Sequence, residues 1–195
     1  MKLIKLDAID STNSYLKALL KGTTPKNFTT IVTENQTKGR GQQESNWLSE
    51  PNKNLTFSVF ISHENLKIIH QKSLNFAISL AIYDVLFTKN ISKIAIKWPN
   101  DIYIENKKLG GILLEMIGDP VGHCNVIVGV GLNVSMPALQ AAAIDQDWTD
   151  VTTELQAQQS PADGPKLSVR NKLAAALISE ILPLLDTFQT RGFAA

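Results

Sequence analysis

A polar stretch between two apolar runs constrains the fold of this chain more than any other feature. The runs are Ile94–Ile96 and Ile112–Leu114, and between them lie Lys97-Trp98-Pro99-Asn100-Asp101 and Lys107-Lys108-Leu109-Gly110-Gly111. Apolar runs of this kind form buried strands, and Glu105–Lys107 has the composition of a turn. We therefore expect a hairpin with charged groups at its mouth. Its carboxylate, amide and ammonium groups, together with the adjacent glycines, indicate a site where an anionic group contacts the backbone directly. The alternative interpretation is a lysine-rich surface turn.

Length and composition fit one globular domain. The 195 residues are 44% hydrophobic and 19% charged, enough for a sizeable core. A net charge of +1 without a basic block argues against a dedicated nucleic-acid binder, so an anionic ligand should be small and locally held. A lone Cys124 and three scattered histidines predict neither disulfides nor zinc. No stretch resembles a signal peptide or a membrane span, so we expect a cytoplasmic protein that does not contact a membrane.

The spacing of apolar residues predicts further strands and helices. Strands are expected at residues 3–9, 29–33, 54–61 and 125–134. Helices are expected at 66–86, at 168–188 and after the capping residues 10–13, where the helix should end at Gly22. Pro183 should kink or split the last helix. Phe76 and Phe87 are expected in the core, and Thr152–Pro165 is expected to be a loop.

Three more polar segments lie at the ends of these elements. Asp10–Asn13 carries helix-capping side chains, which either only cap the helix or also receive a polar ligand. Residues 34–46 contain no aliphatic side chain and form either a functional or a plainly solvated loop, in which Gly39-Arg40-Gly41 suits an anion. Gly129-Val130-Gly131 interrupts an apolar strand, which marks the close approach of a ligand or another backbone, and Asn133 brings an amide nearby.

In this order, the four polar segments resemble the catalytic domain of biotin protein ligases. The resemblance is carried by Asp10-Ser11-Thr12-Asn13, Gln36, Gly39-Arg40-Gly41, Trp47, Lys97-Trp98-Pro99-Asn100-Asp101, Lys108-Leu109-Gly110-Gly111-Ile112-Leu113 and Gly129-Val130-Gly131-Leu132-Asn133. The resemblance covers most of residues 3–190. The Lys-Trp-Pro-Asn-Asp run followed by Lys-Leu-x-Gly-Ile-Leu is a highly specific motif of the family, whereas Gly-Arg-Gly alone would be weak evidence. Pattern and resemblance together imply an α+β fold, a mixed, largely antiparallel sheet with helices packed on one face, similar to class II aminoacyl-tRNA synthetases.

The resemblance implies an ATP-dependent ligase whose single catalytic domain spans residues 1–195. Biotin attacks the α-phosphate of MgATP to give biotinyl-5′-AMP and pyrophosphate, and a lysine of a biotin carboxyl carrier protein then takes the biotinyl group. Two anions must meet, which requires fixed cations and N–H donors. The alternatives are an enzyme like lipoate–protein ligase, or a catalytically impaired module that binds biotin or a nucleotide.

The resemblance also implies a role for each site residue. The catalytic residues would be Lys108, Arg40 and Asp101. Biotin would be bound by Ser11, Thr12, Asn13, Gln36, Gly39, Gly41, Gly111, Gly129 and Gly131, with Gly110 also leaving room for it. The nucleotide would be bound by Arg40, Gln42, Trp47, Lys97, Asn100, Lys108 and Asn133. Asp101 and Asn100 would hold Mg²⁺, or Asp101 would accept the proton of the acceptor lysine, since an ammonium is not a nucleophile.

The chain departs from the family pattern in two places. Many members carry more Arg and Lys after Gly-Arg-Gly, whereas Gln42–Asn46, which includes Glu44, stands here. We therefore expect a loop that covers the adenylate through amides and apolar contacts, and ATP binding that depends weakly on salt. We expect no helix-turn-helix before residue 1 and therefore no DNA binding. We also expect no SH3-like carboxy-terminal domain; if the natural protein lacks it, ATP binding and acceptor docking would be weakened, and if the chain is truncated, activity would be lost. Relatives often form homodimers through edge strands, which the sequence leaves open.

Overall fold

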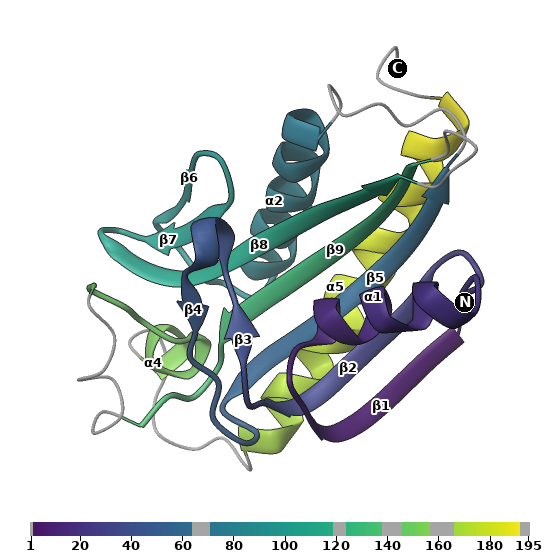
Figure 1. The fold of residues 1–195 in the computed structure, drawn as a ribbon. Helices are drawn as coiled ribbons and strands as arrows, with labels where there is room; N and C mark the ends of the chain where they lie inside the picture. The colour runs from purple at the N-terminus through teal and green to yellow at the C-terminus, as the bar shows by residue number, and fades with distance from the viewer. Residues whose placement is uncertain (1, 64–70, 119–123, 138–145, 157–165, 192–195) are drawn as a thin grey trace.

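A computed structural model describes residues 2–63, 71–118, 124–137, 146–156 and 166–191. A seven-stranded sheet forms its centre, in the order β1-β2-β5-β9-β8-β7-β6 (Figure 1). The strands are β1 (Lys2–Ile9), β2 (Thr29–Gln36), β5 (Asn54–His63), β6 (Ile94–Lys97), β7 (Asp101–Ile104), β8 (Lys107–Gly118) and β9 (Cys124–Asn133). β1 pairs with β2 in parallel, and the other pairings of this sheet are antiparallel. The predicted mixed, largely antiparallel sheet is confirmed.

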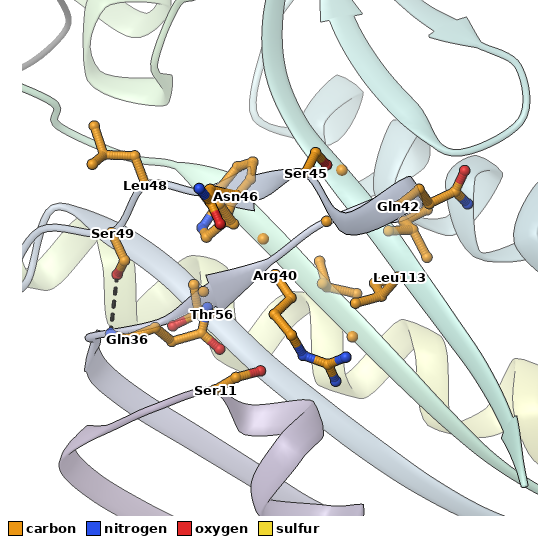
Figure 2. Close-up of a pocket in the computed structure, with 18 of the residues that line it drawn as sticks. Ser11, Gln36, Arg40, Gln42, Ser45, Asn46, Leu48, Ser49, Thr56 and Leu113 are labelled. Carbon is orange, nitrogen blue, oxygen red and sulfur yellow. Dashed lines mark hydrogen bonds between the residues drawn. The ribbon is translucent and has the colours of Figure 1, made fainter. Parts of the chain in front are cut away.

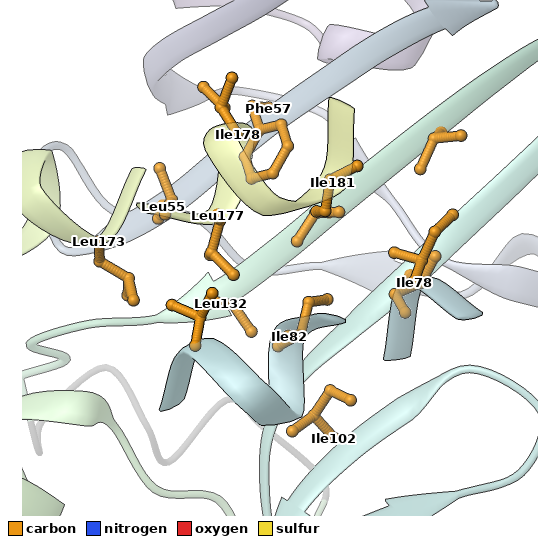
Figure 3. Close-up of a cluster of buried hydrophobic side chains, with 14 of the residues drawn as sticks. Leu55, Phe57, Ile78, Ile82, Ile102, Leu132, Leu173, Leu177, Ile178 and Ile181 are labelled. Carbon is orange, nitrogen blue, oxygen red and sulfur yellow. The ribbon is translucent and has the colours of Figure 1, made fainter. Parts of the chain in front are cut away.

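The helices cover both faces of the sheet. They are α1 (Thr12–Gly22), α2 (Gln71–Thr88), α4 (Val151–Gln156) and α5 (Lys166–Arg191). Side chains alternate along a strand. In β5, Phe57 faces the main core under α2 and α5 (Figure 3), as does Val59, whereas Phe60 packs with Leu16 of α1 on the other face. Helices on one face are therefore confirmed for α2 and α5, whereas α1 lies on the opposite face.

A small hairpin lies in front of the sheet, on the same side as α1 (Figure 1). Its strands β3 (Gly39–Arg40) and β4 (Asn46–Trp47) pair only with each other in the described chain and are joined by a 3₁₀ turn, η1 (Gln42–Glu44). Gln43 in this turn has a φ of 50°, in the left-handed region. The polar loop predicted here is thus an ordered hairpin.

Several predicted details of the fold are wrong. The polar stretch after β6 contains a strand of its own, β7, in which Ile102 and Ile104 are buried, and β8 begins at Lys107 rather than at Ile112. Phe76 and Phe87 are 47% and 61% exposed, so they do not belong to the core.

The predicted boundaries differ in three further places. α5 runs unbroken through Pro183. Residues 152–156 belong to α4 rather than to a loop, and the rest of that predicted loop, like residues 66–70 of the predicted helix, lies outside the described residues. In the described part of the chain, no helix is long and apolar enough to cross a membrane.

Candidate active site

A cavity of 1470 Å³ opens between the β3–β4 hairpin and the α1 face of the sheet (Figure 2). It brings together sequence-predicted residues from all four polar segments. These are Ser11, Thr12, Asn13, Gln36, Gly39, Arg40, Gly41, Gln42, Trp47, Asn100, Asp101, Lys108, Gly111, Gly129, Gly131 and Asn133. The sequence reasoning missed other lining residues, among them Thr56 and Trp148. The four segments therefore meet in one place, as the sequence predicted.

Two residues with predicted site roles do not line this cavity. The ammonium of Lys97 lies 5.1 Å from the ring centroid of Tyr103, where the negative face of the ring attracts it. A Cβ at Gly110 would clash with the side chain of Leu132 and the carbonyl of Gly131. Gly110 therefore permits the close approach of two strands rather than leaving room for a ligand, and the structure does not support Lys97 as a nucleotide ligand.

The first turn of α1 supplies one polar end of the cavity. Ser11 is the N-cap of the helix, and its side chain accepts from the Ser14 N–H. The backbone N–H of Thr12 donates to Gln36 Oε1 at 2.8 Å, and the Thr12 hydroxyl lies 3.0 Å from the same oxygen. These groups are uncharged and nearly buried. This end therefore suits a neutral polar ligand group better than an ion.

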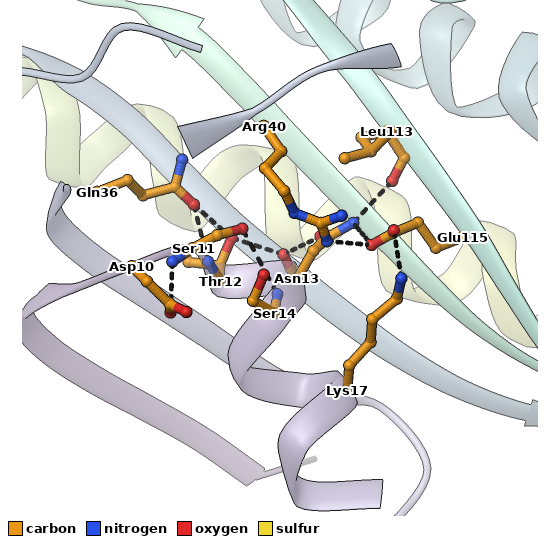
Figure 4. A network of polar contacts seen from close by, with 11 residues as sticks. Asp10, Ser11, Thr12, Asn13, Ser14, Lys17, Gln36, Arg40, Leu113 and Glu115 are labelled. Atoms are coloured by element: carbon orange, nitrogen blue, oxygen red, sulfur yellow. Dashed lines mark hydrogen bonds and ion pairs between the residues drawn. The ribbon is translucent and has the colours of Figure 1, made fainter. Parts of the chain in front are cut away.

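Asn13 lies under the cavity in a buried network (Figure 4). Its Oδ1 is 2.5 Å from the hydroxyl of Ser58, and its Nδ2 donates to Glu115 Oε2 at 2.8 Å. Ser58 is 2.6 Å from the Thr12 hydroxyl, so the network continues to the helix N-terminus. Sequence reasoning missed Ser58, although it is a hydroxyl between Phe57 and Val59 on an apolar strand.

The two glycines of β9 make room for side chains above them. A Cβ at Gly129 would lie 3.0 Å from Asn13 Cγ and closer still to its Oδ1, and a Cβ at Gly131 would lie 2.8 Å from the Trp47 ring. The predicted close approach is thus made in this structure by Asn13 and by Trp47. Among the described residues, the Trp47 Nε1 is buried and has no hydrogen-bond partner.

The opposite end of the cavity is charged. Lys108 Nζ lies 2.9 Å from Asp101 Oδ2, and each side chain is 19% exposed. Asn100 is pinned to β8, since its Nδ2 donates to Ile112 O at 3.1 Å and its carbonyl accepts from Ile112 N at 2.8 Å. The backbone of Lys108 bonds to residues 147 and 149, which brings Trp148 to the cavity. This end can hold an anion beside Lys108.

The residues present offer a partial magnesium site. The described chain contains no cluster of three metal-ligating side chains. Asp101 and the Asn100 amide are adjacent oxygen donors, and Mg²⁺ is commonly held by one or two carboxylates with phosphate oxygens and water as the remaining ligands. The donor set therefore fits a Mg²⁺ that arrives with a nucleotide.

Arg40 forms an ion-pair cluster that the sequence did not predict. Its Nη2 lies 2.9 Å from Glu115 Oε2, and Lys17 Nζ lies 2.6 Å from Oε1 of the same carboxylate. Burial raises the pKa of Glu115, but hydrogen bonds from Lys17 and Asn13 and the charge of Arg40 outweigh this, so the pKa is lower than usual. The sequence feature that could have indicated this cluster is Glu115 itself, a lone glutamate within the apolar run from Ile112 to Ile117.

Asn133 is held by a second buried network. Its Oδ1 accepts from Asn54 Nδ2 at 3.0 Å, and its Nδ2 donates to Thr149 O at 3.2 Å. Arg170 of α5, 1% exposed, donates to Asn54 O at 2.8 Å and to Thr33 O at 2.6 Å. Burial lowers the pKa of Arg170. Arg170 therefore anchors the strand ends beside the cavity, which no local sequence pattern indicated.

Fold and cavity together define an α+β protein whose cavity has an uncharged polar end and a charged end. The sequence matches the model of the biotin/lipoate A/B protein ligase family over residues 6–133, so the chain belongs to this family. The family expected from the sequence motifs is confirmed.

Individual relatives agree with this assignment. The chain is 32% identical over 189 residues to the bifunctional ligase/repressor BirA of Escherichia coli (strain K12), covering 97% of this chain and 55% of the relative. It is 31% identical over 142 residues to the biotin–[acetyl-CoA-carboxylase] ligase of Paracoccus denitrificans, covering 72% and 57%. The chain thus spans little more than half the length of these relatives.

A solved structure is similar over nearly the whole chain. The biotin protein ligase of Aquifex aeolicus in complex with biotin and ATP has a TM-score of 0.74 and 27% identity, covering 98% of this chain and 73% of that one. The biotin protein ligase of Leishmania major in complex with biotinyl-5-AMP shares the fold, with a TM-score of 0.66 and 23% identity. The match covers 96% of this chain and 79% of that one.

Proposed function

We propose that this chain is the catalytic domain of a biotin–[biotin carboxyl carrier protein] ligase. It would activate biotin with ATP as biotinyl-5′-AMP and transfer the biotinyl group to a lysine of the carrier protein. One observation carries the proposal: a single cavity joins an uncharged polar end at Thr12 and Gln36 to a charged end formed by the Lys108–Asp101 ion pair. A ligand with a neutral ring at one end and a carboxylate at the other fits this division, and the Aquifex aeolicus relative holds biotin and ATP.

The neutral end would bind the ureido ring of biotin. Ser11, Thr12 and Gln36 are nearly buried and uncharged, so they can exchange hydrogen bonds with the ring without an ion to desolvate. Asn13 supports them from below through Ser58. Glycines around the cavity would let the ring and chain of biotin approach the backbone; these are Gly39, Gly41, Gly111, Gly129 and Gly131.

The charged end would bring the two reacting anions together. Lys108 is the cation beside which the biotin carboxylate and the α-phosphate would meet, because phosphoryl charge needs a fixed positive group where water is excluded. Arg40 lines the same cavity and, from its position beside Glu115, would add positive charge. Trp47 would cover the adenine, with Gln42, Asn100 and Asn133 as further nucleotide contacts. Mg²⁺ would neutralise phosphate charge, held by Asn100 and by Asp101, unless Asp101 instead serves the acceptor amine.

Transfer needs a neutral lysine on the acceptor. Asp101 is 19% exposed in its side chain, so an incoming amine can reach it, and it is adjacent to the cation that would hold the adenylate. We assign Asp101 the role of positioning that amine and accepting its proton. A cytoplasmic carrier protein would be the partner. A homodimer would form through a free sheet edge, β1 or β6.

Pyrophosphate release separates this function from its alternatives. With MgATP, release should depend on biotin and should not respond to lipoate. Release of pyrophosphate with MgATP and lipoate, but not with MgATP and biotin, would instead identify a lipoate–protein ligase, an activity that the family description covers. Biotin binding without any release would identify a binding module.

A further inference from the structure

The β3–β4 hairpin covers the cavity, and two of its described side chains reach the main sheet. The Trp47 ring lies over Gly131 of β9, and the Arg40 guanidinium reaches Glu115 of β8. Each strand of the hairpin has two residues. An isolated two-stranded hairpin is at best marginally stable in water, so contacts with the sheet must hold this one in place.

Glu115 is built to hold Arg40. Its side chain is 14% exposed, whereas that of Arg40 is 39% exposed, so the carboxylate is the more buried partner of the pair. Lys17 occupies Oε1, and Asn13 shares Oε2 with Arg40 (Figure 4). The carboxylate is thus oriented from the α1 side before the hairpin reaches it.

We propose that Glu115 is a positioning residue that latches the β3–β4 hairpin over the cavity through Arg40. With the latch closed, the hairpin would retain the adenylated acid until an acceptor arrives, a consequence that rests on the proposed function. Gln42, Gln43, Ser45 and Asn46 at the hairpin tip carry no charge, so the tip offers no ionic contact of its own from these residues. Among the described side chains of the hairpin, Arg40 and Trp47 make the contacts with the main sheet on which closure would depend.

Hydrogen exchange of the free protein, read by mass spectrometry, tests the latch without any ligand. Glu115→Gln keeps the shape of the side chain and removes its charge. Exposed ion pairs contribute modestly to stability, so Glu115→Gln should raise the population of the open hairpin about fivefold. The backbone amides of residues 39–47 should then exchange faster by the same factor. Arg40→Gln should give the same increase, and the double variant no more than either single one, because both remove one contact.

Lys17→Gln is the matched control. It removes an ion pair from the same carboxylate but leaves the Arg40 contact in place, so exchange of residues 39–47 should stay within about twofold of the wild type. Unchanged exchange in Glu115→Gln, or additive effects of Glu115→Gln and Arg40→Gln, would overturn the latch.

A second measurement connects the latch to the reaction. Glu115→Gln should release bound biotinyl-5′-AMP about fivefold faster, while transfer from the still-bound adenylate to an acceptor keeps its wild-type rate. A slowed transfer with unchanged release would show that Glu115 acts on the chemistry and would overturn the retention role. A protein that forms no adenylate refutes the proposed function, whereas the exchange experiment decides the latch independently.

Discussion

Gly129→Ala perturbs the floor of the cavity at one atom. The added Cβ would lie 3.0 Å from Asn13 Cγ and closer still to Oδ1, below the 3.4 Å at which ordinary van der Waals contact begins. Gly129 lies in the middle of β9, paired with Ser58 on one side and Leu113 on the other, so the backbone cannot yield easily. The Asn13 amide must therefore move, by about 1 Å.

That movement strains two hydrogen bonds of Asn13 and breaks at least one of them. The bond with Ser58, at 2.5 Å, and the bond with Glu115, at 2.8 Å, cannot both survive it. Each is worth about 1 kcal/mol net, and the loss of conformational freedom in the unfolded state offsets less than about 1 kcal/mol. With some strain from overpacking, we expect the free energy of unfolding to fall by about 2 kcal/mol.

Urea denaturation of Gly129→Ala beside Gly118→Ala measures this. Gly118 ends β8, is exposed, and has nothing within 4 Å of an added Cβ, so its substitution should be neutral or slightly stabilising. Biotin binding by calorimetry should weaken only in Gly129→Ala. Equal stability of the two variants, to within about 0.5 kcal/mol, would refute the reasoning, because the Asn13 network would then tolerate the displacement.

Three other perturbations have definite expected results. Arg170→Met leaves the carbonyls of Asn54 and Thr33 without their buried donor and should lower the free energy of unfolding by about 3 kcal/mol, whereas Lys172→Met on the exposed side of α5 should change it little; similar denaturation curves would contradict this. Because the pKa of Glu115 is lower in the folded state, its contribution to stability is complete above the pKa of an unfolded glutamate, about 4.3, and is lost as the pH falls through the lower folded value. Glu115→Gln should remove that part of the acid dependence of the melting temperature, and an unchanged acid profile would count against it. Asp101→Asn should slow transfer from preformed adenylate more than adenylate formation, and equal losses in both steps would exclude the assigned role.

Short-range sequence patterns predicted the strands and the polar segments well, because each depends on local composition. The glycines of β9 indicated a close approach, but which side chain approaches is decided by residues over a hundred positions away, such as Asn13. β7 was missed because two buried isoleucines in four residues are a weak signal inside a charged stretch.

The remaining misses concern contacts between distant segments. The ion pair of Arg40 with Glu115 joins a hairpin to a strand 75 positions later, and Arg170 bonds to backbone 116 and 137 positions away. Nothing in the local sequence encodes such partners. Phe76 and Phe87 were misplaced because aromatic residues at helical spacing look alike on the inner and outer faces of a helix.

Mass spectrometry of a biotin carboxyl carrier domain, incubated with biotin, MgATP and this protein, tests the central claim most directly. One lysine of the carrier should gain one biotinyl group, and the gain should require biotin, ATP and Lys108, so that Lys108→Gln abolishes it. A carrier that stays unmodified while the wild-type protein is folded and binds biotin, or one that is modified with lipoate but not with biotin, would contradict the assignment.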